Sequence, residues 1–435
     1  NYERKATVKR YDYVYWSSPT IDFNMNGVQA SYRYAWNPTG LNSNGGQGNW
    51  YPVVGNMETG KGYIFRVPNS YSTTSTPDNF TANFTGVPFN GFKSIEINRG
   101  NDFTGNGLLG IPRTISDDNW NLLGNPYPSA IGVNEFLNLN PDLEGFVYVW
   151  THGDAPDDYF ENPFYSSYTY NYDPNDYITI NKTGTTSGPA DYKIGAGQGF
   201  FVLMKSGDIP NTPATANVIF NNSIRSKDFD NTQFYRVSSN SPSVNDNSRL
   251  WLDLNSSQTS TRILIGYVSE ATNDFDRMFD AFTENKNVQN FYSLISGGLY
   301  RIQGRALPFD VNDTVPLGFN APASGSFSIG LANVDGLFTS STQDIYLEDL
   351  ELGIIHDLRV NPYSFNATQG IHNSRFKLRY TNSVLGNEDF VSDSNSVFVV
   401  SNESLTISSL IENISAIEIY DVLGRKLYQN KNVNT

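Results

Sequence analysis

The chain has 435 residues, of which 38% are hydrophobic and only 17% are charged, and its formal net charge is −15. This length predicts two to four domains, and the acidic balance, without a basic footprint, argues against nucleic acid as a partner. The absence of cysteine excludes disulfides, thiolate catalysis and zinc sites with cysteine ligands.

The apolar runs and the first residues bear on location. No run approaches the length of about 18 residues that a membrane-spanning helix needs, so we expect no membrane span. The chain begins at Asn1 without Met or a signal peptide, from which we expect a processed or truncated fragment. An acidic shell keeps a secreted protein soluble and can also hold divalent cations.

Short strands dominate the predicted structure. A helical period is confined to residues 133–139, and elsewhere apolar residues alternate with polar ones or form short runs between turn residues. The clearest predicted strands are 62–67, 146–150, 199–204, 249–254, 263–268 and 376–380. The sequence therefore predicts an all-β fold made of tandem sandwich-like domains.

Three short patterns recur in the same order within the first half of the chain. The patterns WSSP, YAWN and GKGYIFRV are followed by LGNP, YVWT and GQGFFVL, at 16–19, 34–37, 60–67, 123–126, 148–151 and 197–203. This period is too long for a solenoid repeat, and we interpret it as a duplicated β unit with an enlarged loop in the second copy. The copies would span about 1–115 and 116–233, either as separate domains or as halves of one sandwich.

Polar stretches mark the expected boundaries. Residues 238–248 are rich in Ser and Asn and separate a β-sandwich region, 1–233, from a second sandwich domain, 234–382. Residues 383–396 are polar and acidic and predict a linker. The last segment, 397–435, begins with strand-like residues and predicts a small β domain.

An aromatic row suggests one binding surface. Tyr168, Tyr170 and Tyr172 alternate, so they would share one face of a strand, and Trp150 is close in sequence. An exposed row of rings would stack on sugars, as in a carbohydrate-binding module, whereas a buried row would be core. Surface glycans are therefore one candidate class of partner.

Catalytic motifs are absent, and no enzyme activity is predicted. The chain contains no HExxH, GxSxG, P-loop or GxGxxG motif. His356 and Asp357 would point to opposite faces of a strand, so we interpret His356 as a hydrogen-bonding residue at a sheet end. A carboxylate-dependent glycoside hydrolase is an alternative, because paired acids occur at Glu348, Asp349 and Glu351 and at Asp157, Asp158 and Glu161.

Acidic turns provide the candidate metal ligands. The clusters are Asp154 with Asp157 and Asp158, and residues 273–276 with Asp280. Neither cluster follows the spacing of an EF-hand loop, so we interpret both as ordinary turns and predict no cofactor, with calcium as the alternative.

The chain ends in a predicted strand, turn and strand that carries the most informative motif. Its residues are Ile419, Tyr420, Asp421, Val422, Leu423, Gly424 and Arg425. This stretch resembles the middle of the type A C-terminal sorting domain of the type IX secretion system, in which an apolar residue and Tyr or Phe precede Asp, two apolar residues, Gly and Arg. The Pro-Asn-Pro opening, the later Gly-x-Tyr strand and the basic tail of that family are missing, so the match is incomplete.

Other segments resemble flavobacterial cargo of the same system. Residues 120–131, WNLLGNPYPSAI, are the most characteristic. The resemblance implies a non-catalytic, adhesin-like Bacteroidetes protein that is secreted or attached to the cell surface. It would travel through the periplasm and outer membrane, and its partners would be the outer-membrane translocon and a shuttle protein that receive residues 419–425. A β module with exposed strand edges suits that role, because a carrier can add a strand to it.

Overall fold

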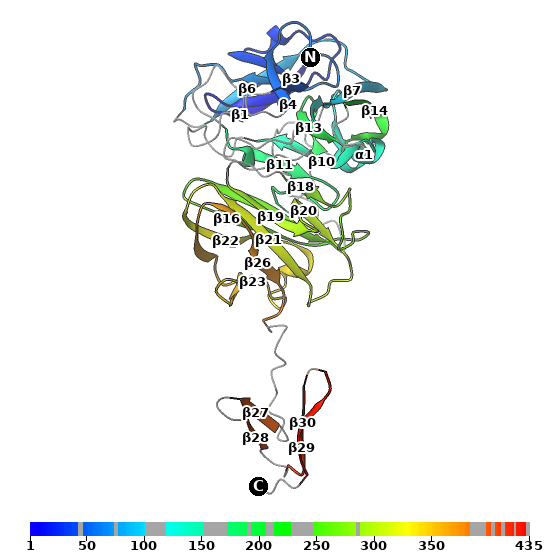
Figure 1. The fold of residues 1–435 in the computed structure, drawn as a ribbon. Helices are drawn as coiled ribbons and strands as arrows, with labels where there is room; N and C mark the ends of the chain where they lie inside the picture. Colours follow the sequence, from blue (N-terminus) through cyan, green and yellow to red (C-terminus); the bar gives the residue numbers. More distant parts are fainter. Residues whose placement is uncertain are drawn as a thin grey trace. The chain divides into compact units, whose positions relative to one another are not determined.

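The computed structural model divides the chain into two compact units, residues 1–381 and residues 382–435. Its described residues are 1–41, 47–73, 77–100, 119–151, 172–188, 193–205, 213–227, 247–283, 288–382, 397–401, 405–409, 414–421 and 423–431. Strands supply nearly all the regular structure of both units (Figure 1), which confirms the predicted all-β fold.

The first unit opens with a set of six strands. Four of them form an antiparallel sheet in the order β2-β5-β3-β4, while β1 and β6 pair with each other. Their bounds are β1 (Tyr2–Val8), β2 (Tyr13–Trp16), β3 (Tyr32–Leu41), β4 (Gln47–Pro52), β5 (Tyr63–Arg66) and β6 (Asp78–Phe84). Burial alternates along β1, as in a strand with one face toward a core, whereas β2 and β5 are buried throughout.

A second set of strands follows. An antiparallel sheet has the order β11-β10-β13-β8, β7 pairs with β14, and β12-β9-β15 form a small sheet near helix α1. The bounds are β7 (Lys93–Arg99), β8 (Trp120–Gly124), β9 (Ala130–Gly132), α1 (Val133–Leu139), β10 (Leu143–Trp150), β11 (Tyr177–Ile180), β12 (Lys193–Ile194), β13 (Gly199–Met204), β14 (Ala214–Phe220) and β15 (Arg225–Ser226). Helix α1 lies where the sequence predicts it.

The two sets share one topology and one register. Strands β2, β3, β4 and β5 correspond to β8, β10, β11 and β13, and the outer pair β1/β6 corresponds to β7/β14. Tyr34 pairs with Ile64 in the first sheet, and Tyr148 pairs with Phe201 at the matching position of the second. This agreement supports the interpretation of a duplicated unit, although β7 pairs within the second set and precedes the predicted boundary at 115/116.

The two sets are joined by reciprocal main-chain contacts. Trp16 forms an antiparallel bridge with Gln198, and Leu123 forms the equivalent bridge with Lys61. The Ser17 amide donates to the Gly197 carbonyl at 2.8 Å, and the Gly124 amide donates to the Gly60 carbonyl at 2.9 Å. Each set therefore receives the loop of the other, as two halves related by an approximate two-fold axis would.

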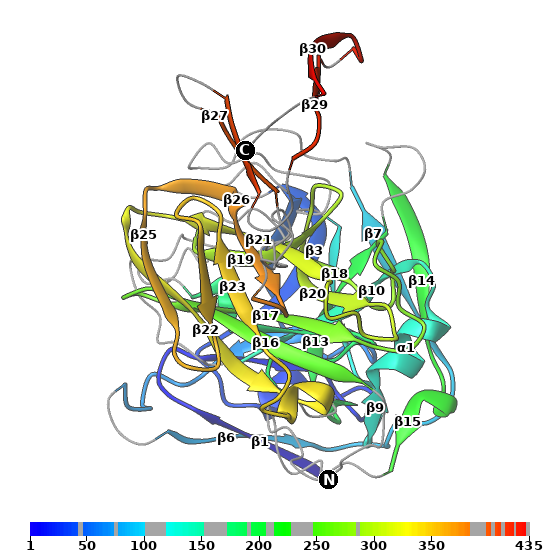
Figure 2. The same ribbon diagram turned by 90° about the horizontal axis from the view of Figure 1, so that it is seen from below.

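The rest of the first unit is an eleven-stranded sheet, drawn from below in Figure 2. Its order is β24-β23-β26-β21-β19-β20-β17-β16-β22-β25, with β18 paired to β20. The bounds are β16 (Ser248–Asn255), β17 (Ser260–Tyr267), β18 (Ala281–Phe282), β19 (Asn290–Ile295), β20 (Gly298–Arg305), β21 (Thr314–Ala321), β22 (Gly325–Val334), β23 (Tyr346–Asp349), β24 (Ile354–Asp357), β25 (Tyr363–Ala367) and β26 (Gly370–Arg379). The sheet curls on itself, because the rings of Phe365 in β25 and Phe376 in β26 lie 4.7 Å apart.

An aromatic-rich core connects the duplicated sets to this large sheet. Its members include Phe146 and Tyr148 of β10 together with Trp251, Leu264 and Ile302 of the large sheet. Residues 1–381 accordingly form one compact unit, and the predicted boundary at 233/234 falls inside it.

Short helices complete the described structure. Besides α1 there are 3-10 turns η1 (Met25–Gly27), η3 (Pro174–Asp176), η4 (Asn222–Ile224) and η5 (Gly336–Thr339). Among the described residues, no helix has the length and apolar character needed to traverse a bilayer.

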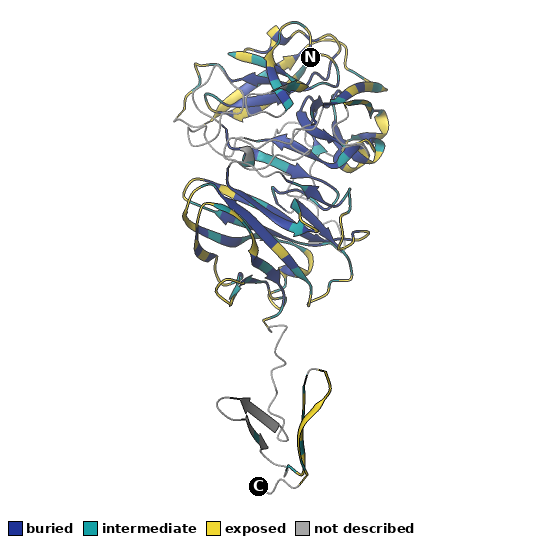
Figure 3. Cartoon of the chain, in the orientation of Figure 1, coloured by how far each residue is buried: buried dark blue, intermediate teal, exposed yellow. Residues whose placement is uncertain are grey.

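The second unit contains two hairpins. Strand β27 (Val397–Ser401) pairs with β28 (Leu405–Ser409), and β29 (Ile417–Tyr420) pairs with β30 (Lys426–Asn430). Strand β30 is exposed over most of its length (Figure 3). The predicted linker 383–396 lies outside the described residues.

The seam between the duplicated sets predicts an effect of substitution at Gly124. A Cβ there would lie 2.1 Å from Ser17 Cβ and 2.8 Å from the Lys61 carbonyl oxygen. We expect Gly124→Val to lower the free energy of unfolding by about 2–3 kcal/mol, measured by urea denaturation, because the two sets must move apart. The matched control is Gly325→Ala in β22, where a Cβ meets no atom within 4 Å; equal losses at both positions would contradict the prediction.

Candidate functional site

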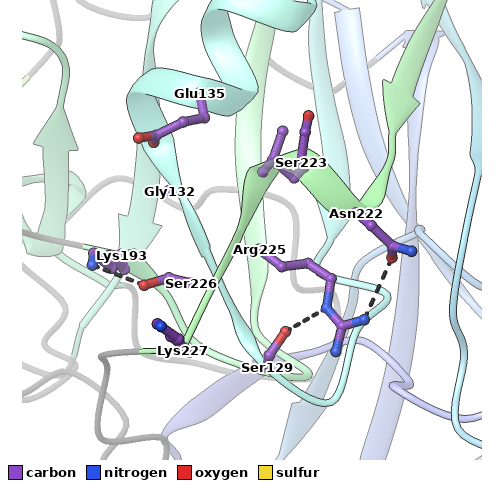
Figure 4. A pocket seen from close by; sticks show the side chains of 10 residues that line it. Ser129, Gly132, Glu135, Lys193, Asn222, Ser223, Arg225, Ser226 and Lys227 are labelled. Atoms are coloured by element: carbon purple, nitrogen blue, oxygen red, sulfur yellow. Dashed lines mark hydrogen bonds between the residues drawn. The ribbon is translucent and has the colours of Figure 1, made fainter.

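A cavity of about 560 Å³, lined mainly by residues with polar side chains, opens beside the second duplicated set (Figure 4). Its lining comes from the loop before β9, the start of α1, strand β12 and the η4–β15 segment. The lining residues are Ser129, Gly132, Glu135, Lys193, Asn222, Ser223, Ile224, Arg225, Ser226 and Lys227. Segments distant in sequence therefore meet around one space.

Asn125 shapes the loop that carries Ser129 to the cavity. Its side chain is fully buried, and its Nδ2 lies 2.8 Å from the Ser129 carbonyl oxygen and 3.0 Å from that of Gly195. Its Oδ1 accepts from the Tyr127 amide at 3.0 Å. A short amide that binds nearby main-chain groups in this way fixes a turn, which explains the role of the Asn-Pro-Tyr-Pro sequence.

Arg225 is held in the cavity wall by neutral groups. Its Nε donates to Ser129 Oγ at 2.9 Å and its Nη1 donates to Asn90 Oδ1 at 3.0 Å. The guanidinium carbon lies 5.1 Å from the centre of the Tyr127 ring, whose hydroxyl donates to the Gly91 carbonyl at 2.7 Å. Burial raises the pKa of Tyr127 to about 12, despite the opposing effect of Arg225, so the ring stays neutral at physiological pH.

Two lysines and one carboxylate complete the charged lining. Lys193 donates to Ser226 Oγ at 2.8 Å, and Lys227 and Glu135 are exposed. The described lining therefore carries three cations against one carboxylate in a chain of net charge −15. Such a site attracts anions.

The sequence predicted the WNLLGNPYPSAI segment as a family marker and missed the cavity that it frames. Lys193, Arg225 and Lys227 were not identified, because the two segments that supply them are separated in sequence from this motif. Only the motif itself was a signal, since its Asn and Pro residues indicate a fixed turn.

The structure places part of the predicted glycan platform in the core. Trp150 is 5% exposed and stacks on Tyr15 at 5.8 Å, and Tyr172 is 7% exposed and donates its hydroxyl to the Tyr11 carbonyl. The prediction that Trp150 and Tyr172 form an exposed stacking surface for sugars is therefore wrong, because neighbouring aromatic rings already cover both side chains. Tyr168 and Tyr170 lie outside the described residues.

The described paired acids are engaged in ion pairs. Asp349 is fully buried and accepts from Arg375 Nη2 at 2.9 Å, while Glu348 on the opposite face accepts from Arg379 Nη1 at 3.1 Å. Burial alone would raise the pKa of Asp349, but hydrogen bonds from Arg375 and Tyr363 outweigh it, so the net shift is downward. Asp157, Asp158 and Glu161 lie outside the described residues.

The two described histidines bind main-chain oxygens. Nε2 of His356 lies 2.8 Å from the Asn361 carbonyl oxygen, as the sheet-end interpretation predicts, and Nε2 of His372 lies 2.9 Å from that of Thr368. Neither histidine contacts a serine or threonine hydroxyl in the described hydrogen bonds.

The acidic turns have separate outcomes. Asp154, Asp157 and Asp158 lie outside the described residues, so the calcium alternative stays open there. In the second cluster, Asp280 accepts from the Gly304 amide at 2.8 Å and from the Asp276 amide at 2.6 Å. Within the described residues, no group of three or more acidic or histidine side chains is arranged to hold a metal ion.

The C-terminal motif forms the turn of the β29–β30 hairpin. Asp421 Oδ1 accepts from the amides of Leu423 and Arg425, and its Oδ2 accepts from Arg425 Nε at 2.6 Å. These hydrogen bonds lower the pKa of Asp421. Gly424 has a φ of +77°, and Leu423 is 77% exposed. Ile419 and Tyr420 belong to β29, whereas Val422 lies outside the described residues.

Comparisons with known proteins identify relatives. A family model described as Domain of unknown function (DUF8693) matches residues 1–380, and another, described as Domain of unknown function (DUF8694), matches residues 385–435. The minor fimbrium subunit Mfa5 of Porphyromonas gingivalis is 25% identical over 281 residues, or 63% of this chain. The chain spans 22% of the length of that relative. No solved structure matches the chain.

The buried Asp280 predicts a pH dependence of stability. Burial raises its pKa to about 7, against the lowering effect of the two amides. An unfolded Asp titrates near pH 4, so the contribution of Asp280 to folding is complete below about pH 4 and is lost as the pH rises through about 7. Acidification from pH 8 to pH 5 should therefore stabilise the wild type more than Asp280→Asn, by about 2–3 kcal/mol in urea unfolding.

The control for this measurement is Asp142→Asn at an exposed carboxylate, which should keep the wild-type pH dependence. An Asp280→Asn protein with the same gain on acidification as the wild type would contradict the assignment to Asp280.

Proposed function

The chain belongs to the DUF8693 family, and on that premise we propose that it is a non-catalytic, adhesin-like region of a secreted or cell-surface protein. We propose further that the type IX secretion system exports it, with residues 397–435 as the signal that the translocon and its shuttle protein receive.

The observation that carries the export proposal is the independence of the C-terminal segment. Residues 382–435 cluster as their own compact unit, and a separate family model covers 385–435. A carrier can therefore engage this segment while residues 1–381 keep their own core.

The hairpin turn supplies a surface that the export carrier can contact. Asp421 organises the turn with its carboxylate, which leaves the side chains of Leu423 and Arg425 exposed. Among the described residues, β29 and β30 pair with each other and with no further strand, so their outer edges are open to strand addition. Strand addition at such an edge gives affinity through the main chain and selection through alternate side chains.

Surface location and adhesion are supported by the relative. A minor fimbrium subunit of Porphyromonas gingivalis matches 63% of this chain, and the strand-rich fold of this chain suits an extracellular role of that kind. The ion pairs of Glu348 and Asp349 support a non-catalytic role, because paired carboxylates of this kind are not available to a substrate.

Export through the hairpin is testable in a type IX-competent flavobacterial host that expresses the full chain behind an added signal peptide. We expect Asp421→Ala to reduce the secreted fraction about tenfold, because the turn loses its carboxylate acceptor. Gly424→Val should act similarly, because its positive φ strains any residue with a branched Cβ by about 1–2 kcal/mol. The secreted fraction is measured by immunoblot of medium and cells.

Two controls separate recognition from general damage. Lys431→Ala alters an exposed charge near the hairpin, and Gly353→Val imposes the same kind of strain at a φ of +65° in the first unit. Both should be secreted as the wild type is. Normal secretion of Asp421→Ala and Gly424→Val would sink the export proposal.

A further inference from the structure

We propose that the cavity beside Arg225 binds an acidic sugar, meaning a saccharide of one or two rings that carries a carboxylate. This inference deepens the proposed adhesin-like function and rests on it for its biological meaning. Binding by the purified chain is independent of export, so the failure of one proposal is distinguishable from the failure of the other.

The first argument is the charge of the lining. Lys193, Arg225 and Lys227 face one cavity, with Glu135 as the only carboxylate among its described lining residues. The chain as a whole has 44 acidic residues against 29 basic ones. Three cationic side chains around one cavity create a positive local potential in an otherwise acidic protein, and this potential favours an anionic ligand.

The second argument is that no described carboxylate forms an ion pair with Arg225. Five arginines of the first unit form ion pairs with carboxylates, namely Arg249, Arg262, Arg305, Arg375 and Arg379, whereas others such as Arg33, Arg99 and Arg359 donate to main-chain oxygens. Arg225 instead contacts hydroxyl and amide oxygens and an aromatic ring, and no described carboxylate lies within ion-pair distance of it.

These neutral contacts orient the guanidinium without cancelling its charge. Its Nε and Nη1 are engaged by Ser129 and Asn90, whereas Nη2 has no described acceptor. A carboxylate oxygen suits that position, because charge-assisted hydrogen bonds to a pre-oriented arginine are strong and directional. The side-chain entropy that binding would otherwise cost is already lost in the free protein.

The third argument is the polarity and size of the cavity. The hydroxyls of Ser223 and Ser226, the Asn222 amide and the Glu135 carboxylate also line the cavity (Figure 4). Sugar hydroxyls both donate and accept, so they match this mixed set better than an apolar ligand would. A volume of about 560 Å³ falls in the range of small-ligand sites and exceeds what a lone inorganic anion fills.

The test is a calorimetric titration of the purified full chain with digalacturonate, and in parallel with the neutral digalactose and with inorganic phosphate. We expect digalacturonate to bind at least tenfold more tightly than either comparison ligand, and its affinity to fall with added salt. Arg225→Gln and Lys227→Glu should each weaken digalacturonate binding about tenfold.

The control is Lys5→Glu, which reverses an exposed charge on β1 outside the cavity and should leave binding unchanged. Lys227 is exposed, so Lys227→Glu remains informative even if Arg225→Gln fails to fold. The proposal is overturned if digalacturonate binds no more tightly than digalactose or phosphate. It is equally overturned if Lys227→Glu binds digalacturonate as the wild type does.

Discussion

The reciprocal main-chain contacts between the duplicated sets are the constraint on which the first unit depends. The Ser17 amide reaches the loop of the second set, and the Gly124 amide reaches the loop of the first. The approach is so close that position 124 has no room for a side chain. These contacts fix the two four-stranded sheets against each other, and the aromatic core then forms between those sheets and the large curled sheet.

The same seam determines where the cavity lies. Asn125 follows Gly124 directly, and its buried amide sets the course of the loop that delivers Tyr127 and Ser129 to Arg225. One short segment, 124–129, therefore both forms the main-chain contact inside the molecule and lines the charged cavity at its surface. The turn places the Ser129 hydroxyl where it accepts from Arg225, so this arginine is held in the cavity wall by neutral partners.

Local patterns in the sequence predicted the strands and the helix well, but they did not predict which of these elements pack against one another. A short apolar run located β13, the helical period located α1, and the recurrence of YAWN and YVWT placed Tyr34 and Tyr148 at matching registers. The side-chain period of a strand does not say which face is covered, so Trp150 and Tyr172 were compatible with either core or surface until their tertiary neighbours were known. The cavity is lined by segments that are far apart in sequence, and no local sequence pattern predicts that they lie close together in the fold.

A seam made of main-chain atoms has an evolutionary consequence. Backbone amides and carbonyls are identical in every residue except proline, which lacks the donor, so the hydrogen bonds of the junction do not depend on side-chain identity, although the close approach at position 124 requires glycine. Trp16-Ser17-Ser18 and Leu123-Gly124-Asn125 occupy equivalent places although they share no residue. Helix α1 of the second set therefore coexists with the same main-chain junction that holds the first set.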